Sequence, residues 1–92
     1  MPRYLVERSF PEGLAVPTTA YGAAAMAMVI ANNASEGVTW VQSYVTADRR
    51  CSFCIYDGPS PESIQRAALL NQLPVGKITE VRVLDPYFYH HQ

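Results

Sequence analysis

The two cysteines of this chain are its most obvious candidates for redox chemistry or metal binding. Cys51 and Cys54 have the spacing of a redox or zinc motif. Such motifs need a turn or a helix start that brings the two sulfurs together. Here both cysteines fall in a run typical of a β-strand, where an odd separation sends the side chains to opposite faces. We therefore expect two free thiols that do not bind one ion together, with Cys54 packed as a small apolar residue.

The two histidines are neighbours at the end of the sequence. His90 and His91 are followed by a single glutamine. Adjacent imidazoles bind nickel, copper or zinc through their ring nitrogens. The same pair is equally consistent with a chain end that has no ligand, or with the remnant of a tag. The residues alone leave these alternatives open.

A group of aromatic and amphipathic side chains inside predicted strands suggests a second kind of site. A polar group that faces a packed interior must find a partner, because its desolvation otherwise costs free energy. The side chains that could line one small-molecule pocket are Trp40, Gln42, Tyr44 and Tyr56. The favoured alternative is that such residues satisfy one another across a dimer interface.

Composition and missing motifs narrow the function classes. The formal net charge is -1, so the field that draws proteins to phosphate backbones is absent and nucleic acid is not expected as a partner. The weakly polar run 20–31 is too short to span a bilayer, and the first residues carry no signal-peptide pattern, so a cytoplasmic location is expected. The chain has no glycine-rich phosphate loop and no nucleophile elbow, so an enzyme is the less favoured class.

The elements that must position these residues follow from periodicity and end signals. Alternation with a period of two predicts strands over 3–10, 38–46, 51–56 and 77–84. Capping signals predict helices over 18–33 and 60–73, the second opening on Ser60-Pro61. Two right-handed crossovers then place both helices on one face of a four-stranded antiparallel sheet. The predicted fold is a ferredoxin-like βαββαβ α+β sandwich, with residues 1–92 as one domain.

Three further expectations concern what covers the apolar surfaces. The alanine- and methionine-rich first helix is expected to be deeply buried. Trp40 and Tyr44 are expected on one side of the second strand, with Val41 and Val45 on the other, which leaves an apolar sheet face for a second copy of the chain to cover. The aromatic and histidine-containing tail, 85–92, is expected to add a short fifth strand or to reach a partner.

Four phrases resemble a family of small bacterial proteins long known only as a domain of unknown function, with a nickel-binding, nickel-responsive member. They are VERSFP from Val6, GVTWVQSYV from Gly37, CIYDGPSPESI from Cys54 and ITEVRVLDPYFY from Ile78. The resemblance implies a ferredoxin-like fold, a homodimer and nickel held by side chains near the dimer surface. Gln42 departs from the pattern, which often has histidine there, and an amide is a poorer ligand for nickel.

Three functions are therefore carried forward. The first, which rests mostly on the resemblance, is a cytoplasmic homodimer that binds or sequesters nickel, with Glu7, Cys54, His90 and His91 as candidate ligands. The alternative is a dimeric α+β barrel enzyme or small-molecule-binding protein with a pocket near Trp40 and Tyr44. A third is an interaction module whose aromatic tail docks on a partner.

Overall fold

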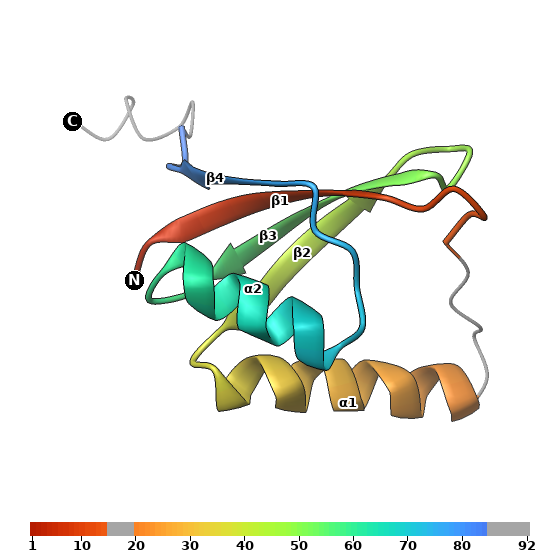
Figure 1. Cartoon of the computed structure of the whole chain (residues 1–92), viewed down its shortest axis with the longest axis horizontal. Coiled ribbons are helices and arrows are strands. Elements are labelled where there is room, and N and C mark those ends of the chain that lie inside the picture. The colour runs from red at the N-terminus through yellow and green to blue at the C-terminus, as the bar shows by residue number, and fades with distance from the viewer. Residues whose placement is uncertain (15–19, 85–92) are drawn as a thin grey trace.

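The fold is a four-stranded antiparallel sheet with two helices on one side (Figure 1). The computed structural model describes residues 1–14 and 20–84 of the chain. The elements in chain order are β1 (Arg3–Ser9), α1 (Ala20–Ser35), β2 (Thr39–Val45), β3 (Cys51–Asp57), α2 (Pro61–Leu70) and β4 (Lys77–Val81). The strand order is β2-β3-β1-β4 and every neighbouring pair is antiparallel. The predicted ferredoxin-like arrangement is confirmed, and neither helix is long and apolar enough to cross a membrane in the part of the chain described.

The start of α2 is determined by local sequence. The side chain of Ser60 accepts a hydrogen bond from the backbone N–H of Ser63, and Pro61 occupies the first turn, where its missing N–H costs nothing. The predicted end at Leu73 is wrong, because the helix stops at Leu70 and Gln72 takes a left-handed conformation. Hydrogen bonds from the N–H groups of residues 72 and 73 back to residues 69 and 68 then close the last turn, so the chain leaves the helix before the proline.

Helix α1 ends with the same device. Gly37 has a positive φ of 70°, its N–H donates to the carbonyl of Ala34, and the next N–H, of Val38, donates to the carbonyl of Asn33. Val38 is thereby turned into the core. The predicted deep burial of α1 is wrong for the single chain, since Met28 and Ile30 are 67% and 57% exposed. A two-layer fold covers only one stripe of a helix, and α1 is apolar around most of its circumference.

Strand β1 alternates as predicted and supplies the centre of the core. Tyr4, Val6 and Arg8 point to the helices and are buried, with Val6 fully inaccessible. Their partners on β3 are Tyr56, Cys54 and Ser52, which share this inner face. The core cluster is completed by residues of other elements: Val38, Ile64 and Ala67. The inner face of the sheet is therefore apolar at one end and carries a guanidinium at the other.

A β-bulge changes the expected orientation of β2. Trp40 pairs with Tyr56, but the register then shifts, so that Gln42 rather than Val41 lies opposite Ile55. One extra residue in a strand reverses the face of everything that follows it. Trp40 therefore faces the helices while Tyr44 faces away from them. The prediction that these two aromatic residues share a side is wrong for this reason.

The last strand is shorter than predicted and ends at Val81, where its pairing with Arg3 of β1 ends. The expected fifth strand falls in 85–92, outside the described residues. The face of the sheet opposite the helices, called the open face below, carries no layer of the described chain (Figure 1). Aromatic side chains on this face include Tyr44, which is 61% exposed, and Phe53, which is 36% exposed.

Candidate functional site

A cavity of about 260 Å³ lies between the inner face of the sheet and α1. Its wall on the helix side includes Met26 and Val29, and Leu73 closes it from the segment that follows α2. Its floor is formed by inward side chains of β1, β2 and β3: Arg8, Trp40, Ser43, Val45, Ser52, Cys54 and Tyr56. Helix α1 packs against β2 and α2, and the floor beneath it includes the small side chains Ser43, Ser52 and Cys54. Most of its surface is apolar, as is usual for sites that bind small organic molecules.

Arg8 is the one charged residue among the described lining residues of this cavity, and it is 4% exposed. Its Nε and Nη1 atoms are buried without a hydrogen-bond partner among the described residues. The guanidinium carbon lies 5.5 Å from the centroid of the Tyr56 ring, a cation–π contact. A ring face offers no hydrogen-bond acceptor of carbonyl or carboxylate strength, so the two N–H groups stay unsatisfied.

The polar groups around Arg8 are neutral. Burial raises the pKa of Tyr56 to about 12, although the Arg8 charge acts in the opposite direction, so this hydroxyl keeps its proton at neutral pH. The hydroxyl of Ser52 lies 3.6 Å from the sulfur of Cys54. The indole N–H of Trp40 donates to the hydroxyl of Ser43 at 2.8 Å. The cavity thus combines one fixed positive charge with neutral donors and acceptors.

The bulge in β2 divides the four residues predicted to line a small-molecule pocket. Trp40 and Tyr56 line the cavity. Gln42 and Tyr44 lie on the open face, where the Gln42 amide donates a hydrogen bond to the Tyr44 hydroxyl. The prediction of one pocket near Trp40 and Tyr44 is therefore wrong in its geometry. Sequence reasoning missed Arg8, although the period of two puts its charge on the same strand face as Tyr4 and Val6.

The candidate metal ligands are also divided. Glu7 lies on the open face opposite Phe53, whereas Cys54 lies on the inner face opposite Val6, so the sheet itself separates these two donors. They cannot bind one ion within a single chain, so the prediction of a metal site that includes both Glu7 and Cys54 is wrong for one chain. Cys51 and Cys54 occupy opposite faces as predicted, and both are free thiols.

No group of three or more histidine, cysteine, aspartate or glutamate side chains that could hold a metal ion occurs within 1–14 and 20–84. His90 and His91 lie outside the described residues. The described residues of one chain therefore do not fit a preformed nickel site.

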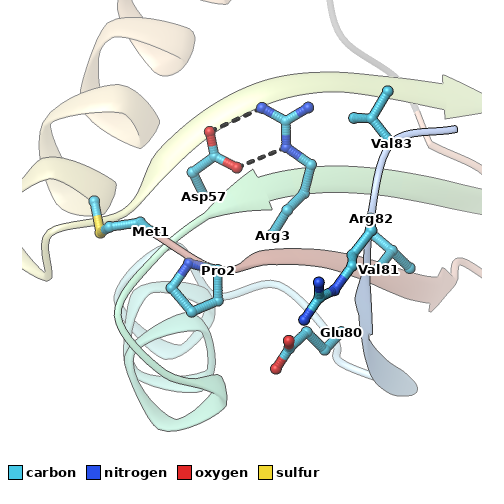
Figure 2. Close-up of a pocket in the computed structure, with 8 residues that line it drawn as sticks. All are labelled: Met1, Pro2, Arg3, Asp57, Glu80, Val81, Arg82 and Val83. Atoms are coloured by element: carbon cyan, nitrogen blue, oxygen red, sulfur yellow. Dashed lines mark hydrogen bonds and ion pairs between the residues drawn. The ribbon is translucent and has the colours of Figure 1, made fainter. Parts of the chain in front are cut away.

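A second, more open hollow of about 530 Å³ lies at the end of the sheet where β1 begins and β3 and β4 end (Figure 2). Both carboxylate oxygens of Asp57 accept hydrogen bonds from Arg3, at 2.7 and 3.0 Å. The guanidinium holds the pKa of Asp57 below its ordinary value. Glu80 and Arg82 lie across the hollow from this pair (Figure 2). Because Asp57 is committed to Arg3, this hollow offers fewer free polar groups than the number of its charges suggests.

The element order, the strand order and the helices on one face define a ferredoxin-like α+β protein with a cavity beneath its sheet. The crystal structure of SCO4226 from Streptomyces coelicolor A3(2) has the same fold, with a TM-score of 0.70 and 20% sequence identity over 90% of this chain and 99% of that chain. A search of curated proteins found no match. The chain belongs to the family described as nickel responsive protein SCO4226-like, whose model matches residues 4–81 of its 92.

Proposed function

We propose that this chain is a nickel-binding protein that works as a homodimer. The observation that carries the proposal is its membership of a family described as nickel responsive, matched over residues 4–81. In this proposal the principal donors are the imidazoles of His90 and His91, a ligand type that suits nickel. Glu7 of the open face is the carboxylate candidate in the body of the protein. Cys54 is not included, because it lies in the cavity on the other side of the sheet.

The open face of the sheet is the proposed dimer surface. Tyr44 and Phe53 expose apolar area there, and Val41, at the bulge, is 41% exposed. A domain of this size buries a smaller fraction of its surface than larger domains do, so pairing of two such faces would add stability. Glu7 lies on the same face, which would bring one carboxylate from each copy to the interface.

Nickel binding is tested by calorimetric titration of protein without an added tag, with zinc and copper titrated in the same way. We expect saturable nickel binding of micromolar affinity or better, lost in the double variant His90→Ala/His91→Ala. Sedimentation of the same samples should give twice the chain mass of 10.2 kDa. The matched control is Glu62→Gln, which removes an exposed carboxylate from the first turn of α2, on the other side of the sheet from Glu7 (Figure 1).

The outcomes separate the parts of the proposal. Nickel binding that survives loss of both histidines but is lost in Glu7→Gln would move the site to the open face. No nickel binding by the untagged protein would refute the proposal. A sedimenting monomer would refute the dimer.

A second candidate function is the binding of a small organic molecule in the cavity beneath the sheet. The cavity itself favours it, since three strands, α1 and Leu73 line it and most of that lining is apolar. Trp40 lines the cavity and is the only tryptophan in the chain, so its fluorescence reports on occupancy. We expect octanol, a neutral apolar probe, to change Trp40 emission saturably. A linear change that never saturates would count against binding of a neutral apolar ligand in the cavity.

A further inference from the structure

We propose that the cavity is selective for a small carboxylate with an apolar body, and that the carboxylate binds the guanidinium of Arg8. The inference rests on the second candidate function, the binding of a small molecule beneath the sheet, and is independent of nickel. It names the chemical class of ligand and the residue that selects it.

The first step of the argument is the state of Arg8. Arg8 is only 4% exposed, and two of its nitrogens have no partner among the described residues. Arginine keeps its charge under all ordinary conditions, so it cannot escape desolvation by losing a proton. The cation–π contact with Tyr56 compensates only part of that cost. A buried cation without a charged partner destabilises the folded state, and a bound anion would reduce that destabilisation.

The second step is that the described neighbours of Arg8 provide no such anion. The residue opposite Arg8 on β3 is Ser52, and the pairing of β1 with β4 ends at Glu7, before it reaches Arg8. Glu7 itself projects to the other face of the sheet. The carboxylates seen in ion pairs belong to Asp57, bound to Arg3, and Glu36, bound to Arg66. No carboxylate among the described residues is therefore seen to pair with Arg8, and we assign the counter-charge to a bound molecule.

The third step concerns the rest of that molecule. A carboxylate is a common partner of arginine, and its oxygens accept charge-assisted hydrogen bonds from guanidinium N–H groups such as the unpartnered Nε and Nη1 of Arg8. Arg8 is the only cation among the described lining residues, so the site neutralises one negative charge and is poorly suited to a phosphate with two. Beyond Arg8 the cavity is walled by Met26, Val29 and Leu73, which suit an apolar chain or ring. A volume of about 260 Å³ is below that of most drug-sized sites, so the ligand is small.

The experiment compares octanoate with octanol, which share a chain length and differ in charge. Both are titrated against Trp40 fluorescence in the wild-type protein and in Arg8→Met, Arg8→Lys and the control Arg3→Met. We expect octanoate to bind the wild type about tenfold or more tightly than octanol, because its carboxylate makes charge-assisted hydrogen bonds to Arg8 that octanol cannot make. Arg8→Met should abolish this preference while keeping octanol binding, and Arg8→Lys should keep part of it. Arg3→Met should keep it in full, since Arg3 lies outside the cavity.

The results distinguish this inference from the cavity function on which it rests. Equal binding of octanol and octanoate by the wild type, or an undiminished preference for octanoate in Arg8→Met, would overturn the carboxylate inference and leave the cavity function standing. Binding of neither probe would overturn both. If circular dichroism shows that Arg8→Met is unfolded, the wild-type preference and the behaviour of Arg8→Lys decide the matter.

Discussion

Replacement of Arg8 with methionine is expected to make the ligand-free protein more stable, raising the free energy of unfolding by about 1–3 kcal/mol. Methionine fills a similar elongated space and needs no hydrogen bonds, whereas the guanidinium is 4% exposed with two unsatisfied nitrogens. For a domain of this size each 1 kcal/mol corresponds to a shift in melting temperature of roughly 4–8 °C. Urea and thermal unfolding, followed by circular dichroism, measure both quantities.

The matched control is Arg3→Met on the same strand. Arg3 lies on the open side and donates two hydrogen bonds to Asp57, so its replacement removes satisfied interactions and is expected to lower stability. Octanoate should raise the melting temperature of the wild type more than that of Arg8→Met, by mass action on the folded state. A clear loss of stability in Arg8→Met would show that the guanidinium is already compensated, and would remove the reason for expecting an anion.

Replacement of Ile64 with alanine is expected to cost about 2–5 kcal/mol, the largest loss foreseen for a single change in the core. Ile64 is 2% exposed and connects α2 to the cluster formed by Tyr4, Val6 and Val38. A methyl group built on Gly58 would lie 3.1 Å from the Cδ1 of Ile64, so the backbone before α2 packs directly on this side chain. Removal of three carbons leaves a void that this close packing cannot readily fill.

The control for Ile64→Ala is Leu69→Ala, five residues later on the same helix. Leu69 is 78% exposed, so its truncation is expected to change stability by no more than about 0.5 kcal/mol. Urea unfolding of both variants gives the comparison directly. Equal losses for the two would mean that α2 packs with a different face, for example against a second copy of the chain.

The nickel-responsive family was recognised from whole phrases of sequence, and the match over residues 4–81 confirms it. Individual ligands were harder to predict. Glu7 and Cys54 are both plausible metal ligands by residue type. Ligands of one ion must also lie close together, and these two side chains project from opposite faces of the sheet. Arg8 was not among the candidates. A charged residue in a strand suggests a binding site only when the structure shows that its side chain is buried and which hydrogen-bond partners surround it.

Several features of this fold depend only on near neighbours in the chain and can be predicted from the sequence. Local hydrogen bonding and steric preference account for the cap at Ser60, the end of α1 at Gly37, the alternation of β1 and the hairpin between β2 and β3. The order of these elements then allows few topologies. Three features are seen only in the folded structure: the bulge at Val41, the exposure of α1, and the lack of a carboxylate partner for Arg8 among the described residues. Each of these depends on pairing or packing between segments far apart in the chain. One extra residue in β2 changes which side chains of that strand face the helices. The described segments around β1 bring no carboxylate to Arg8, so two of its nitrogens have no partner there.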